Sequence, residues 1–203
     1  MQQFEIIKIL QNDLKFENND LEKLKKFTQM LLSENKKYNL IGKSTENVIW
    51  QRHILDSAQI VKFIDFSASL LVDLGSGAGF PGLVLAIFNK NPNFHVKLYE
   101  KSPVKRVFLK KVIKLLSIKA EVENNIYDYP IEANIIVSRA FKKLEEILKI
   151  SREMRKKPHK ILVLKGKNAQ EEINRLSLDA NYSYKIKKSI TNIDSKIIIF
   201  DVT

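Results

Sequence analysis

Residues 70–82 read LLVDLGSGAGFPG, an apolar run that passes directly into a cluster holding four of the chain's six glycines. The run at 70–74 has the length and composition of a buried parallel strand. Glycines after such a strand permit positive φ and leave room for a ligand against the backbone. Pro81 is favoured in the first turn of a following helix. The stretch therefore predicts a strand, a ligand-binding loop and a helix, in that order.

An acidic residue, Glu100, ends the next predicted strand, 25 residues after Gly75. A carboxylate there can accept hydrogen bonds from both ribose hydroxyls of an adenosine-type ligand. Two cofactors fit this pattern, a nicotinamide dinucleotide and S-adenosylmethionine. The chain's one Tyr-x-x-x-Lys, Tyr184 to Lys188, lies in a predicted edge strand, where the two side chains share no helix face. Asp73, an acid at the end of the strand before the loop, suits a nearby sulfonium, and the two closing strands without a helix between them suit the methyltransferase variant of the fold. S-adenosylmethionine is favoured, on architecture more than on any single residue.

The rest of the chain sets the fold around this loop. Residues 1–65 show helical periodicity, and strands alternate with helices from residue 70 onward. This order predicts an α/β fold, a Rossmann-like doubly wound sheet with an antiparallel edge hairpin, as in class I S-adenosylmethionine-dependent methyltransferases. We divide the chain into an N-terminal helical extension (1–65) and a methyltransferase domain (66–203). The expected strands are 70–74, 94–100, 120–122, 134–137, 161–165, 182–187 and 196–202, and the expected helices are 81–88, 103–116, 142–152 and 169–178.

The composition limits the classes of protein that remain. The 203 residues carry a formal net charge of +12 and no cysteine, which excludes disulfides, thiolate metal sites and a cysteine nucleophile. Three dispersed histidines predict no metal site. The 29 Lys, 25 Ile and 16 Asn indicate codon bias, so the charge alone does not establish nucleic-acid binding. No leader peptide and no apolar run of roughly 18 residues is visible. We expect a cytoplasmic protein with no membrane association and, by default, a monomer.

Several short motifs follow one another in an order far more specific than the glycine loop alone. They are Tyr38-Asn39-Leu40, His53 to Ser57, Asp73 to Gly82, Lys105-Arg106 with Phe108-Leu109, Ser138 to Phe141, and Leu164-Lys165-Gly166. This set, over roughly residues 35–170, resembles the RsmG (GidB) family of small-subunit ribosomal RNA methyltransferases. The resemblance implies methyl transfer from S-adenosylmethionine to N7 of a guanine in the decoding-site region of 16S rRNA, within the 30S subunit or an assembly intermediate.

The resemblance also implies site residues. The family commonly has an acidic pair where Ile126 and Tyr127 stand, and Asp where Glu100 stands. Backbone contacts to adenine would survive the first change, and the longer carboxylate should preserve the ribose contact. We expect Arg139 and Lys165 to be catalytic by positioning. The full cofactor set is Gly75, Gly77, Phe80, Glu100, Ile126, Tyr127 and Arg139, and the substrate set is Asn39, His53, Lys105, Arg106 and Lys165.

The predicted reaction makes few demands on the protein. Guanine N7 has a lone pair and no proton to remove, so attack on the methyl group requires positioning and no general base. The lack of a His/Asp pair beside the loop is therefore consistent with catalysis. Two alternatives remain open: a methyltransferase of another RNA, a protein or a small molecule on this scaffold, and a non-catalytic RNA-binding relative.

Overall fold

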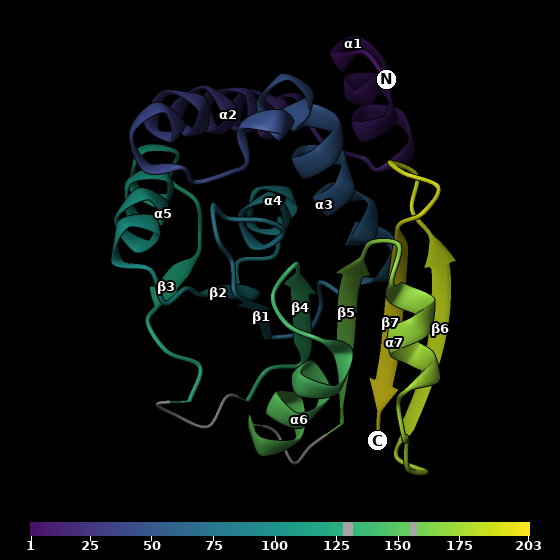
Figure 1. Ribbon diagram of the computed structural model, residues 1–203. Coiled ribbons are helices and arrows are strands. Elements are labelled where there is room, and N and C mark those ends of the chain that lie inside the picture. The colour runs from purple at the N-terminus through teal and green to yellow at the C-terminus, as the bar shows by residue number, and fades with distance from the viewer. Residues whose placement is uncertain (128–131, 155–157) are drawn as a thin grey trace.

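A computed structural model describes residues 1–127, 132–154 and 158–203, and these form seven strands in one sheet with helices on both faces (Figure 1). The strand order is β3-β2-β1-β4-β5-β7-β6. Only β7 runs against the others, and it pairs with β5 on one side and with β6 on the other. The strands are β1 (Leu70–Leu74), β2 (His95–Tyr99), β3 (Glu121–Glu123), β4 (Ile135–Arg139), β5 (His159–Lys165), β6 (Tyr182–Lys188) and β7 (Lys196–Val202).

Alternation along the strands divides the core between the two faces. Leu71 joins a hydrophobic cluster with α4 (Gly82–Phe88) and α5 (Pro103–Leu115). Its neighbour Val72 joins a second cluster with α6 (Leu144–Met154) and α7 (Ala169–Asn174). Because successive side chains point to opposite faces, near-continuous apolar strands are what a sheet covered on both sides requires. The doubly wound fold with an antiparallel edge hairpin is confirmed.

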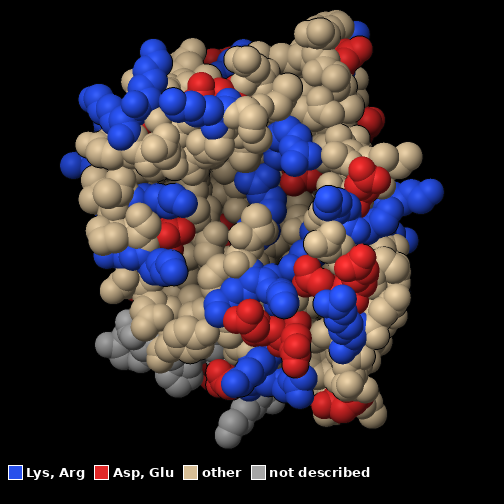
Figure 2. All heavy atoms as spheres, in the orientation of Figure 1, with Lys and Arg blue, Asp and Glu red and all other residues tan. Residues whose placement is uncertain are grey.

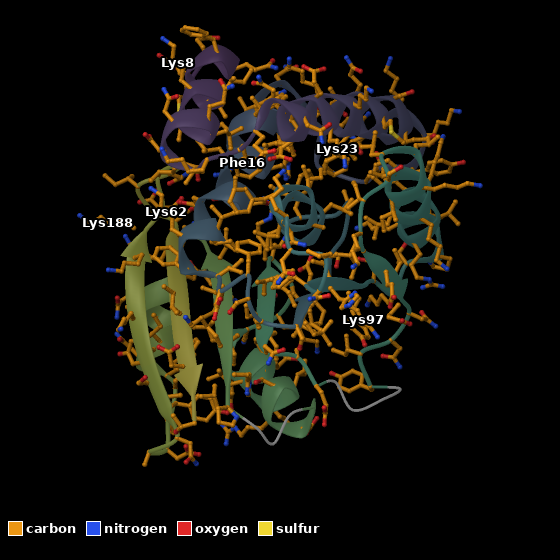
Figure 3. All side chains as sticks on the ribbon, turned by 180° about the vertical axis from the view of Figure 1, so that it is seen from behind. Lys8, Phe16, Lys23, Lys62, Lys97 and Lys188 are labelled. Carbon is orange, nitrogen blue, oxygen red and sulfur yellow. The ribbon has the colours of Figure 1, made fainter. Side chains whose placement is uncertain are left out.

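The N-terminal helices extend the first of these clusters across the carboxyl edge of the sheet. Phe27 stacks on Phe108 of α5 with ring centroids 6.4 Å apart. Phe16, labelled in Figure 3, follows the first N-terminal helices, and its ring centroid lies 4.8 Å from that of Phe88. The N-terminal extension (1–65) and the methyltransferase domain (66–203) thus share one hydrophobic core. The boundary at residue 65, where the helical segment gives way to the sheet, stays a prediction. The elements are α1 (Gln3–Lys8), a π-helix (Ile9–Asp13), α2 (Asn18–Tyr38), a 3-10 helix (Lys43–Val48), a π-helix (Trp50–Leu55), α3 (Asp56–Ala58) and a 3-10 helix (Gln59–Phe63).

Candidate functional site

A cavity of about 590 Å³ lies at the carboxyl edge of the sheet. Parallel strands end at the same edge, so Gly75 after β1, Glu100 after β2 and Ala140 after β4 come together there. The N-terminal segment closes another side through Leu40 and His53. Nine of the twelve predicted site residues line this cavity: Gly75, Gly77, Phe80, Glu100, Ile126, Tyr127, Arg139, His53 and Lys105.

The glycine loop forms the floor of this cavity, and its glycines serve different purposes. Gly75 has φ +74, and a Cβ built there would lie 2.2 Å from the ring of Phe141. Gly77 has φ +58, but the nearest heavy atom to its Cβ position is the Gly75 oxygen at 3.9 Å. The chain's own packing therefore requires a glycine at 75, whereas the space above Gly77 is open to a ligand.

Glu100 is held beside that open space by two backbone hydrogen bonds. The amide of Gly77 donates to its Oε2 at 2.8 Å, and the amide of Ser102 donates to its Oε1 at 2.7 Å. A carboxylate has about four lone-pair sites, so two acceptor positions remain for other donors. The oriented carboxylate at the loop suits a pair of ribose hydroxyls.

Asp73 lies beneath the loop and does not line the cavity. Its side chain is fully buried, its Oδ2 accepts the Gly82 amide at 2.9 Å, and burial raises its pKa to about 7. The expectation that this acid stands beside a sulfonium is therefore corrected. Asp73 shares the sheet face that carries Leu71, so its side chain points toward α4 and holds the start of that helix.

Arg139 joins β4 to the N-terminal segment through three contacts. Its Nη1 donates to the Arg52 carbonyl at 2.8 Å and lies 3.5 Å from Asp56 Oδ2, and its Nη2 lies 2.8 Å from His53 Nδ1. The guanidinium also stands 5.1 Å from the centroid of the Phe80 ring. Most of its hydrogen-bonding capacity is thus used to fix a wall of the cavity, so any ligand contact at Arg139 is made by a side chain already held in place.

His53 is the neutral partner in that cluster. Its Nδ1 must accept, because an arginine can only donate, so the proton sits on Nε2, which donates to Thr45 Oγ1 at 2.9 Å. Burial, reinforced by the charges of Arg139 and Arg52, lowers the pKa of His53 from 6.5 to about 3. His53 therefore stays uncharged at neutral pH and acts as a fixed acceptor for Arg139.

This arrangement makes stability depend on pH at His53. Because its pKa is lower in the folded state, the unfolded chain binds the proton first, and stability present above pH 6.5 is lost as pH falls toward 3. His53→Asn keeps an acceptor oxygen near the Nδ1 position and does not titrate. Relative to this variant, the wild-type free energy of unfolding should fall by up to about 1.4 kcal/mol per pH unit below 6.5. Urea unfolding at pH 7.5 and 5.5 measures the difference, and parallel pH profiles would contradict the assignment.

Three predicted residues stand outside the cavity. Arg106 uses Nη1 to bind the Glu100 carbonyl at 3.1 Å, the Lys101 carbonyl at 2.6 Å and Asn124 Oδ1 at 2.7 Å, which ties together the loops after β2 and β3. Asn39 is exposed and ends α2 in a left-handed conformation at φ 48°. Lys165 pairs with Glu172 at 2.8 Å and lines a second, smaller cavity. Their assignment to RNA stays a prediction.

The opposite wall of the cavity comes from the segment after β3. Ile126 is buried, while Tyr127 is 59% exposed, so these two offer an apolar surface and an exposed aromatic edge. Lys105 stands at the same side. Asn124 and Asn125 also line the cavity and were not predicted, although they follow a strand at the carboxyl edge and the strand-end rule points to them.

The described parts of the chain show neither a metal-binding group nor a membrane-spanning helix. No cluster of three or more His, Asp or Glu side chains is placed to hold a metal ion there, and no helix among them is both long and apolar enough to cross a bilayer.

The fold and the site together define a class of protein. A mixed sheet with β7 reversed, and a glycine loop facing an acid at its carboxyl edge, is the architecture of class I S-adenosylmethionine-dependent methyltransferases. Solved structures with the same fold include M. jannaschii TYW2 in complex with AdoMet, with TM-score 0.52 and 18% identity over 70% of this chain and 72% of that one. A SAM-dependent methyltransferase from Aquifex aeolicus has TM-score 0.57 and 12% identity over 73% and 89%.

Sequence comparison narrows the class to a family. The chain belongs to the GidB family, described as rRNA small subunit methyltransferase G, whose model matches residues 20–198. A Ribosomal RNA small subunit methyltransferase G from Pelagibacter ubique (strain HTCC1062) is 38% identical over 178 residues, 85% of this chain and 84% of that protein. The protein of the same name from Rickettsia akari (strain Hartford) is 38% identical over 179 residues, 88% and 92% of the two chains.

Proposed function

We infer that this protein transfers a methyl group from S-adenosylmethionine to N7 of a guanine in 16S ribosomal RNA. The observation that carries the inference is the open space above Gly77, bounded by the oriented carboxylate of Glu100, in a chain that belongs to the rRNA small subunit methyltransferase G family. The glycine and the acid suit an adenosine-bearing cofactor, and the family supplies the methyl acceptor.

The residues of the cavity fit the cofactor. Gly77 lacks the Cβ that would occupy the open space, and Glu100 keeps acceptor sites for ribose hydroxyls. We assign Ile126 and Tyr127 to the adenine side, where the apolar wall replaces the acidic pair common in the family and leaves adenine to backbone groups. When bound, the cofactor supplies a methyl group on a positively charged sulfur.

The protein's contribution to the reaction is positioning. The N7 lone pair forms the new bond to the methyl carbon while the carbon–sulfur bond breaks and its electron pair neutralises the sulfur. The positive charge passes to the guanine ring and no proton leaves, so no residue has to act as a base. His53 lines the cavity and is neutral, so it could in principle accept a proton, but its Nδ1 already accepts a hydrogen bond from Arg139. His53 is therefore better suited to positioning Arg139 than to acting as a base. Holding two reactants in line can lower a barrier by roughly 7–11 kcal/mol.

The substrate is ribosomal RNA, and its finer identity is part of the proposal. Basic side chains gather on several sides of the hollowed centre of the face that holds the cavity (Figure 2). Lys101, Lys105 and Lys142 line the cavity, where they can neutralise phosphates of an incoming strand. We propose that the protein acts in the cytoplasm as a monomer on the 30S subunit or an assembly intermediate.

The test is methyl transfer from labelled S-adenosylmethionine onto three substrates: 30S subunits, deproteinised 16S rRNA and free nucleosides. We expect label on one guanine of subunits or RNA, located by digestion and mass spectrometry as 7-methylguanosine. Labelling of free nucleosides alone would contradict the RNA assignment, and label on another atom or base would contradict the N7 chemistry.

A further inference from the structure

A second cavity, of about 290 Å³, adjoins the first. It shares His53, Arg139 and Ala140 with the first cavity, so the two cavities meet at the Arg139 cluster. Its far side consists of the end of β5 and the turn between β6 and β7. This volume is at the lower limit of small-molecule pockets, about 300–1,000 Å³, and suits one base better than a dinucleotide.

Gly166 opens this second cavity at the end of β5. Gly166 is exposed at the mouth of the cavity, a Cβ built there meets no heavy atom within 4 Å, and the residue does not have the left-handed φ that would favour glycine. Neither backbone conformation nor internal packing accounts for this glycine. An open space also lies above Gly77 in the first cavity, where the nearest heavy atom to the Cβ position is 3.9 Å away. A glycine that leaves room is what a close-fitting ligand requires.

Two charged side chains of the second cavity keep hydrogen-bonding capacity. Among the described residues, none forms a hydrogen bond or ion pair with the guanidinium of Arg52, which is exposed. Asp56 Oδ1 accepts from Gln59 at 2.9 Å and from Thr191 at 2.8 Å, and the Ser189 hydroxyl lies 3.5 Å from it. Asp56 Oδ2 makes only a long contact to Arg139, at 3.5 Å, among the described residues. The cavity thus offers a cation near its rim and a carboxylate oxygen inside.

We propose that the second cavity holds the target guanine, with Asp56 reading its N1 and N2 donors and Arg52 binding a flanking phosphate. The inference rests on the proposed function and adds the subsite for the acceptor base. Since N7 is the nucleophile, recognition has to use the opposite edge of the base. Guanine presents two adjacent donors there, N1–H and the N2 amino group, and the Oδ2 of Asp56, which makes only the long contact to Arg139 among the described residues, can accept from both. Adenine presents an acceptor at N1 and is rejected.

A side chain that fills the second cavity tests whether the target guanine binds there. Gly166→Leu should leave the fold intact, because its side chain enters open space, and should raise the KM for RNA at least about tenfold with the KM for S-adenosylmethionine unchanged. Asn93→Leu is the matched control, since it adds the same exposed side chain before β2, at the opposite edge of the sheet. A direct readout is titration of guanosine monophosphate against protein saturated with S-adenosylhomocysteine, where binding should be lost in Gly166→Leu and kept in Asn93→Leu.

Replacing the acid tests the reading of the base. RNA carrying inosine at the target lacks the N2 amino group, and the wild type should methylate it with kcat/KM about tenfold lower than the guanine substrate. Asp56→Asn should remove most of this discrimination, whereas a purely structural role for Asp56 would lower both substrates equally. If the wild type methylates no RNA, the proposed function fails. If it does, and Gly166→Leu matches Asn93→Leu on RNA, the guanine subsite is wrong.

Discussion

Gly77→Val should weaken S-adenosylmethionine binding by at least about 100-fold, about 2.8 kcal/mol. The space above Gly77 is empty of protein atoms to 3.9 Å and faces the carboxylate of Glu100, so two methyl groups placed there occupy the volume the cofactor needs. Equilibrium dialysis or calorimetry with S-adenosylmethionine measures the loss directly, without relying on turnover.

In this experiment the effect of backbone strain at residue 77 has to be distinguished from the effect of filling the cofactor's space. Gly77 has φ +58, where a residue with a Cβ costs about 1–2 kcal/mol, and a β-branched residue fits worst. Gly77→Asn is the control, because asparagine tolerates the left-handed region while its side chain still fills the space. Both variants should lose cofactor affinity, but only Val should lower the melting temperature strongly. Wild-type affinity for S-adenosylmethionine in Gly77→Asn would show that the cofactor does not bind in the space above Gly77.

The strand-end rule explains why so much of the cofactor cavity could be predicted from sequence. Gly75, Glu100 and Arg139 each lie at or just after the end of a parallel strand, and parallel strands deliver their carboxyl ends to one edge. Apolar runs bounded by turn residues located those strands to within one or two residues. Side chains alternate between the two faces of a strand, and this explains why Asp73 was wrongly expected beside the cofactor. The odd-numbered positions of β1 face α4 and not the ligand edge.

Long-range pairing explains what the sequence could not predict. Arg106 and Lys165 stand in the expected elements, but their partners come from other segments, Asn124 across the sheet edge and Glu172 on α7. Neither contact follows from the spacing of residues. The second cavity is built from four segments, including the N-terminal helices and the β6–β7 turn, so no single motif indicates it.

Arg139→Ala should lower kcat/KM for RNA methylation by about 100-fold or more, equivalent to about 2.8 kcal/mol of transition-state stabilisation. The guanidinium fixes the wall that both cavities share, so its removal releases His53 and Asp56 and disturbs cofactor and base together. The folded state should survive with a loss of about 1–3 kcal/mol, the cost of leaving buried partners unpaired. Steady-state kinetics should be measured at a temperature where the wild type and the variant are both folded, and the cofactor affinity of each should be measured separately. The two measurements distinguish the loss of turnover from the loss of cofactor binding.

Charge and shape at position 139 can be distinguished by a second variant. Arg139→Lys keeps the positive charge, but one ammonium group cannot reach the Arg52 carbonyl and His53 Nδ1 as the planar fork does, so most of the activity should still be lost. Guanidinium ion, added below denaturing concentrations, should restore part of the turnover of the Ala variant and little of the Lys variant, whose side chain fills the space. Wild-type turnover in Arg139→Ala would show that the residue only joins β4 to the N-terminal segment. Full activity in Arg139→Lys would show that a positive charge suffices and that the fork geometry does not matter.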